Sequence, residues 1–124
     1  GGEVRIGVAV AIAACRMGMP FGVVDVNGTE LVEIAKLVVK ESVSTIVVGY
    51  PRNQSGEATK QTAYVEAFAS QLVDMADEIV FQDESLTSVI AERRLAAQGG
   101  KFTKGDIDAE AASIILQDYL ERRT

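Results

Sequence analysis

Short apolar runs alternate with amphipathic segments along this chain, and the alternation limits the folds that it can adopt. Residues 5–15 (RIGVAVAIAAC) form a nearly unbroken apolar run rich in β-branched side chains, which predicts a strand buried on both faces. The run at 19–26 predicts an antiparallel partner strand. Two further short runs predict strands at 44–49 and 78–82.

Four segments instead carry the apolar spacing of helices, and they span 29–41, 57–75, 87–98 and 107–123. The resulting order, β-β-α-β-α-β-α-α, predicts an α/β domain with parallel crossovers around a central sheet. A length of 124 residues fits a single domain over 1–124. Within 57–75, the stripe of Tyr64, Phe68 and Leu72 is predicted to lie in the core.

Composition excludes several kinds of site. The chain has no histidine and one cysteine, so neither a disulfide framework nor a Cys/His zinc site can form, and Cys15 is expected to be an inert small hydrophobe. Carboxylates remain as metal ligands, and they suit Mg²⁺ or Mn²⁺. The net charge of −6 disfavours broad adsorption to nucleic acid, so any such contact requires a local basic patch or a bridging metal.

Neither a membrane span nor a signal segment is visible, because no apolar run approaches about 18 residues and the chain does not start with a basic region before an apolar core. We therefore expect a cytoplasmic protein with no membrane partner.

Acidic residues at two places in the chain are candidate ligands. Asp83 and Glu84 follow the strand at 78–82, at the edge where ligands bind in open α/β sheets; the alternative is that Asp83 caps the next helix and Glu84 is solvated. Asp108 falls on the core-facing side of the last helix, whereas Asp106 falls on its polar side. Favourable interaction with the helix dipole would also explain Asp108. Without histidine, such carboxylates suit a site where magnesium bridges protein and phosphate.

Four segments together point to a known family: 1–10 (GGEVRIGVAV), 47–59 (VVGYPRNQSGEAT), 81–95 (FQDESLTSVIAERRL) and 104–120 (KGDIDAEAASIILQDYL). In order and spacing they resemble the YqgF/RuvX family of pre-16S rRNA nucleases, also called Holliday junction resolvase-like proteins. The resemblance implies a ribonuclease H-like fold, in which helices flank a mixed five-stranded sheet. It also implies metal-dependent hydrolysis of phosphodiesters and trimming of the 5′ end of precursor 16S rRNA in the bacterial cytoplasm.

By position, the resemblance makes Glu84 and Asp108 catalytic metal ligands, with Asp83 as a supporting ligand and Asp106 as a stand-in. Nucleic-acid contacts are expected from Arg5, Arg52, Asn53 and Lys104, and a basic patch from Arg93, Arg94, Lys101 and Lys104; solvated surface charge is the alternative for each. Thr87 is expected to cap a helix rather than to bind substrate.

The chain also departs from the family pattern. The family has an Asp two residues before the glycine that corresponds to Gly2, so the resemblance implies a further strand and a catalytic Asp ahead of Gly1. Without them, we expect weak activity or none. Ser85 stands where many members carry a basic residue, and 11–19 does not match the usual sequence.

Three other functions remain open from the sequence. A Holliday junction resolvase-like nuclease would act on branched DNA, and an inactive module would bind nucleic acid without cleaving it. A phosphotransferase of the sugar-kinase type would need a second such domain, which 124 residues do not supply. Expected partners are structured RNA or branched DNA, with the pre-ribosomal particle a further one. Either a monomer or a homodimer is compatible with the sequence.

Overall fold

A computed structural model describes residues 4–12, 17–51, 60–84 and 86–122. The chain forms two compact units, one made of 1–27 with 86–124 and the other of 28–85. The elements are β1 (Val4–Ile12), β2 (Met17–Val26), α1 (Glu30–Lys40), β3 (Thr45–Pro51), α2 (Lys60–Ser70), β4 (Glu78–Glu84), α3 (Thr87–Gln98) and α4 (Lys104–Arg122). The predicted order of elements and the α/β class are thereby confirmed, whereas a single domain over 1–124 stays a prediction.

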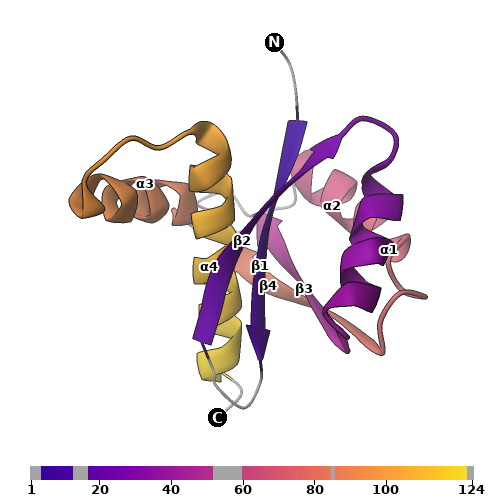
Figure 1. Ribbon diagram of the computed structural model, residues 1–124. Coiled ribbons are helices and arrows are strands. Elements are labelled where there is room, and N and C mark those ends of the chain that lie inside the picture. Colours follow the sequence, from indigo (N-terminus) through magenta and orange to yellow (C-terminus); the bar gives the residue numbers. More distant parts are fainter. Residues whose placement is uncertain (1–3, 13–16, 52–59, 85, 123–124) are drawn as a thin grey trace. The chain divides into compact units, whose positions relative to one another are not determined.

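The first unit is a β-hairpin with two helices. β1 and β2 pair in antiparallel fashion, as predicted, with a bulge between Val8 and Ala9. α4 packs against both strands, and α3 packs on α4 (Figure 1). Ala91 of α3 and Ala111 and Ile114 of α4 form the buried contact between the helices, with Ile107 packed against them.

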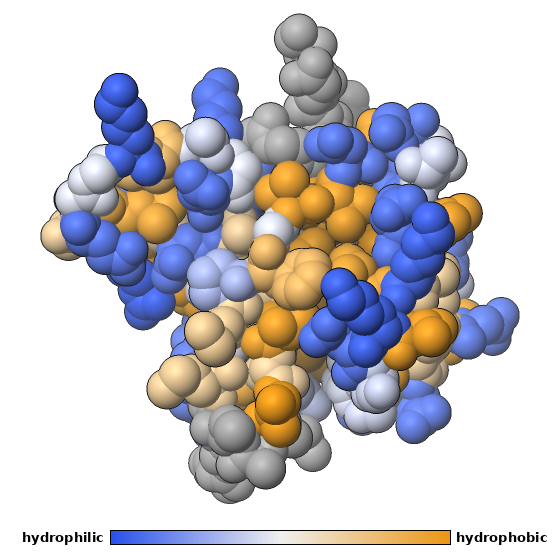
Figure 2. Space-filling view, in the orientation of Figure 1, coloured by the Kyte–Doolittle hydropathy of each residue, from blue (hydrophilic) through white to orange (hydrophobic). Residues whose placement is uncertain are grey.

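The hairpin is covered on one face only. Alternate residues of β2 are exposed, among them Met17, Met19, Phe21 and Val23, while Val24 on the other face is buried. Figure 2 shows apolar side chains gathered over the hairpin on the face in view. The prediction of a first strand buried on both faces is therefore wrong, since Ile12 is 72% exposed and the other described side chains of β1 are only half-buried.

The second unit contains a parallel pair of strands. β3 and β4 run in register from Thr45 and Glu78 to Pro51 and Glu84, and α2 packs against β3. β4 is two residues longer than predicted, so Asp83 and Glu84 belong to the strand rather than to a turn after it. Their backbones pair with Tyr50 and Pro51. Both antiparallel and parallel pairing thus occur in the chain, in one two-stranded sheet each.

The predicted helix at 57–75 is shorter in the structure, because α2 ends at Ser70. The Ser70 hydroxyl donates to the carbonyl of Ala67, and the next backbone N–H groups bond to the carbonyl three residues earlier, as in Leu72 N–H to Ala69 O. Leu72 is buried at 2% exposure, as predicted, but Tyr64 is 56% exposed, so its assignment to the core is wrong. Equal spacing put these side chains on one face without showing how far that face is covered.

Within the described residues, no helix is both long and apolar enough to traverse a lipid bilayer.

Candidate metal and nucleic-acid site

Glu84 lies at the carboxyl end of a parallel strand, where its side chain is half-buried. No hydrogen bond or ion pair joins its carboxylate to another described residue. Burial raises the pKa of Glu84, because the charged carboxylate loses part of its hydration. Carboxylate oxygens are the donors that Mg²⁺ and Mn²⁺ prefer, so Glu84 stays a candidate metal ligand.

Asp83 is exposed and directly precedes Glu84 in β4. Successive side chains of a strand point to opposite faces of the sheet. The structure therefore does not bring these two carboxylates together, and the supporting role of Asp83 stays a prediction.

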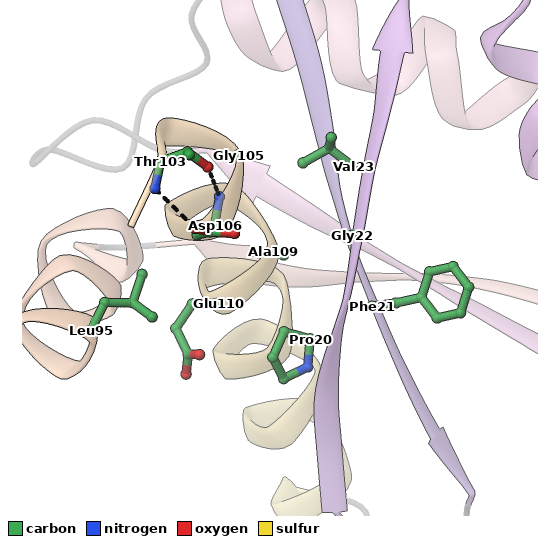
Figure 3. A pocket seen from close by; sticks show the side chains of 10 residues that line it. All are labelled: Pro20, Phe21, Gly22, Val23, Leu95, Thr103, Gly105, Asp106, Ala109 and Glu110. Atoms are coloured by element: carbon green, nitrogen blue, oxygen red, sulfur yellow. Dashed lines mark hydrogen bonds between the residues drawn. The ribbon is translucent and has the colours of Figure 1, made fainter. Parts of the chain in front are cut away.

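Asp106 and Asp108 have different environments on α4. The helix begins at Lys104, three residues earlier than predicted, so Asp106 occupies the first turn and Asp108 the second. The backbone N–H of Thr103 donates to the Asp106 carboxylate at 2.9 Å, and the Asp106 N–H donates to the Thr103 hydroxyl at 3.1 Å (Figure 3). These reciprocal bonds form a capping box, which explains both the earlier helix start and Asp106 itself.

Asp108 is half-buried, as its predicted position on the core side requires. The sequence predicts Asp108 in the first turn of the helix, where the helix dipole would stabilise it. Because α4 begins at Lys104, Asp108 lies in the second turn, and the dipole effect falls off within the first. Its backbone lies directly against Gly7 of β1, a residue that sequence reasoning did not select. A glycine inside a strand of larger apolar residues is the signal that could have identified it, since it marks a close backbone approach.

Basic side chains follow one another in the second half of α3, in the connection to α4 and at the start of α4. Residues 93–105 contain four cations and no carboxylate: Arg93, Arg94, Lys101 and Lys104. All four are exposed, and Arg94 forms a 3.6 Å ion pair with Glu110 of α4. Lys104 is the first residue of α4. These four residues are the basic patch expected from the sequence, and its contact with phosphates stays a prediction.

An open pocket of about 360 Å³ lies in the same unit (Figure 3). It is lined by Pro20, Phe21, Gly22, Val23, Leu95, Thr103, Gly105, Asp106, Ala109 and Glu110. Its charged groups are two carboxylates, which repel phosphate, so the pocket does not fit a nucleic-acid backbone.

The remaining predicted residues are less informative. Arg5 pairs with Asp25 in the register of the hairpin, whereas Arg52, Asn53, Ser85 and Cys15 lie outside the described residues. Thr87 is the first residue of α3 rather than its cap: the cap position is Leu86, and no side chain caps this helix end.

In the described part of the chain, no three acidic or cysteine side chains form a metal-binding group. Glu84 belongs to the unit of residues 28–85, and Asp108 belongs to the unit that contains 86–124.

Comparison with known proteins gives a consistent picture. The model of the family described as "RuvX: Holliday junction resolvase" matches residues 1–122. A protein of Chloroflexus aurantiacus named "Putative pre-16S rRNA nuclease" is 41% identical, with 98% of this chain and 83% of the relative aligned. Proteins of the same name are 36% identical in Anaeromyxobacter sp. strain Fw109-5, over 98% of this chain and 93% of the relative, and 34% in Salinibacter ruber, over 98% and 88%.

Proposed function

Because this chain belongs to the RuvX family, whose fold is ribonuclease H-like, we propose that it is a metal-dependent nuclease that processes the 5′ end of precursor 16S rRNA. The names of its relatives support the substrate, at identities up to 41% over almost the whole chain. The observation that carries the metal dependence is the Glu84 carboxylate, which is half-buried, raised in pKa and without a partner among the described residues.

Glu84 and Asp108 are each proposed as a ligand of Mg²⁺ or Mn²⁺, which when bound would supply an activated water and stabilise the leaving oxygen. The chain's own contribution is placement. The end of β4 holds the Glu84 carboxylate partly shielded from water, which strengthens its attraction to a cation. The second turn of α4 holds Asp108.

The basic patch on the α3–α4 connection would hold the substrate by its phosphates. Arg93, Lys101 and Lys104 are exposed, and Arg94 is already paired with Glu110. Phosphate contacts position a nucleic acid without reading its sequence. The structure of the RNA, rather than its bases, would then select the cleavage site, and cleavage would occur in the cytoplasm, where precursor rRNA is assembled into ribosomal particles.

A second candidate substrate is a branched DNA, which the description of the matching family as a Holliday junction resolvase favours. Resolution of a junction requires two symmetric cuts and hence a homodimer, whereas trimming of RNA requires only one copy. Sedimentation of the protein with each substrate would therefore separate the two functions in addition to the cleavage assay.

The test is cleavage of a labelled precursor 16S rRNA fragment and of a four-way DNA junction, with Mn²⁺, with Mg²⁺ and with chelator. The chain is compared with a version extended at its N-terminus by a family-type strand that ends in Asp. Glu84→Gln and Asp108→Asn should abolish cleavage. Glu78→Gln, at the other end of β4, and Asp106→Asn, on the same helix as Asp108, are the matched controls and should retain it.

Cleavage of RNA but not of the junction supports the proposed substrate, and the reverse result supports resolution. Full activity of Glu84→Gln would overturn the ligand assignment. Binding of RNA by the extended version without metal-dependent cleavage would identify a nucleic-acid-binding module instead.

A further inference from the structure

At Gly7, β1 approaches the main chain of α4 closely, at the residue that carries a proposed metal ligand. A Cβ atom added to Gly7 would lie 2.0 Å from the carbonyl oxygen of Asp108 and 2.4 Å from its carbonyl carbon. It would also lie 3.1 Å from the backbone nitrogen of Ala109. These atoms belong to the main chain of a helix, so they cannot move aside by rotating a side chain.

The other hairpin glycines do not have such a contact. A Cβ at Gly18 would come no closer than 3.1 Å to the carbonyl oxygen of Ser113, and one at Gly22 would meet no atom within 4 Å. Among the hairpin glycines, a distance below 3.0 Å to the main chain of α4 therefore occurs only at Gly7, against the second turn of α4, where Asp108 lies.

We propose that Gly7 is a positioning residue for Asp108: its missing side chain lets β1 serve as the support that sets where this carboxylate stands. The proposal rests on the proposed function, because it takes Asp108 as a ligand of the metal. Magnesium accepts oxygen ligands at 2.0–2.1 Å in near-octahedral geometry, and such sites tolerate misplacement of about 0.5 Å.

The displacement that Gly7→Ala would cause exceeds that tolerance. Ordinary van der Waals contact begins at 3.4 Å, so a Cβ that would lie 2.0 Å from the Asp108 carbonyl oxygen requires β1 and α4 to separate by more than one ångström. Displacement of a catalytic group by about 1 Å can cost on the order of 100-fold in rate. At Gly18 the same substitution requires a shift of only a few tenths of an ångström. The part of α4 that it contacts, at Ser113, carries no proposed metal ligand.

The test compares Gly7→Ala with Gly18→Ala and Gly22→Ala in the version of the chain that is extended at its N-terminus by the strand ending in Asp, because cleavage has to be measurable in the reference protein. Binding of Mn²⁺ is measured from the electron paramagnetic resonance signal of the free ion, and the Mn²⁺ concentration for half-maximal cleavage is measured in parallel. Gly7→Ala should raise both midpoints by about 10- to 100-fold, the range seen when support of a metal ligand is lost. Gly18→Ala should lower the thermal midpoint but leave the Mn²⁺ midpoints unchanged, and Gly22→Ala should change neither.

A substitution at Gly7 could also prevent folding, which circular dichroism would show. The measurement is then made in a Gly105→Ala background with sucrose present. Gly105 lies inside α4, where alanine is the better helix former, and an added Cβ there meets only ordinary contacts at 3.5 Å or more. The Mn²⁺ midpoint of the single variant Gly105→Ala serves as the reference for the double variant Gly7→Ala/Gly105→Ala.

A folded Gly7→Ala protein with the Mn²⁺ midpoint of the unmodified chain would overturn the positioning role. If Asp108→Asn loses Mn²⁺ binding in the same experiment, the proposed function survives that result. If Asp108→Asn itself binds and cleaves normally, the ligand assignment fails first, and the two failures are thereby distinguished.

Discussion

Replacement of Thr87 by valine should stabilise the protein, although it removes a polar group from a helix end. Thr87 is 4% exposed, and its hydroxyl oxygen is buried without a hydrogen-bond partner in the described part of the chain. The preceding Leu86, at φ 58°, occupies the cap position and offers no side-chain bond. A buried hydroxyl that has lost water and gained nothing costs about 1–3 kcal/mol.

Valine has nearly the shape of threonine and the same branching at Cβ, so helix propensity and packing volume change little. The expected gain is therefore the relieved desolvation cost, of which about 1–2 kcal/mol should be recovered. For a chain of this size that corresponds to a rise of roughly 4–8 °C in Tm. Urea denaturation followed by circular dichroism should show a higher midpoint with an unchanged slope.

Thr62→Val is the matched control. Thr62 is 1% exposed but does not lack a partner, so the same change should cost about 1 kcal/mol. If Thr87→Val instead lowers stability by as much as Thr62→Val does, the Thr87 hydroxyl has a bonding partner and the reasoning is refuted. Retention of nuclease activity in Thr87→Val would show in addition that this hydroxyl does not bind substrate.

Three further outcomes are expected. Burial raises the pKa of Glu84 in the folded protein, so the folded state holds this proton to higher pH than the unfolded state does, and stability falls as pH rises through that interval. Glu84→Gln should therefore stabilise the metal-free protein at pH 7 but not at about pH 3, where the carboxyl is neutral in both states. Thermal scans that show the same difference in Tm between variant and unmodified protein at both pH values would contradict this. Thr103→Ala removes one bond of the capping box and should cost about 1 kcal/mol in urea unfolding, whereas Thr103→Ser should cost much less. Lys104→Gln should weaken RNA binding for all sequences and reduce the slope of log K against log salt by about 0.7–0.9, while Lys40→Gln, at the end of α1 in the other unit, should leave the slope unchanged.

The sequence predicted the different faces of α4 correctly, since Asp108 is half-buried and Asp106 exposed. It did not predict where α4 begins, because the bonds between Thr103 and Asp106 extend the helix across Gly105, which reads as a loop residue. The contact at Gly7 is between residues far apart in the chain, and neither spacing nor composition reveals which backbone atoms will meet. Glu84 could be assigned a role through the family resemblance, but its burial and lack of a partner required a structure.

The first unit is assembled from the two ends of the described chain. The hydrogen bond from Gly18 N–H to the Gln117 side chain, 2.9 Å long, joins residues 99 positions apart. Ribosomes add about 5–20 residues per second, so about 5–20 s pass between the synthesis of the hairpin and the synthesis of α4, which covers it. Residues 28–85 can pair their strands during that interval. Nascent chains should therefore acquire the parallel pair first and expose both apolar faces of the hairpin to chaperones until α4 has been synthesised.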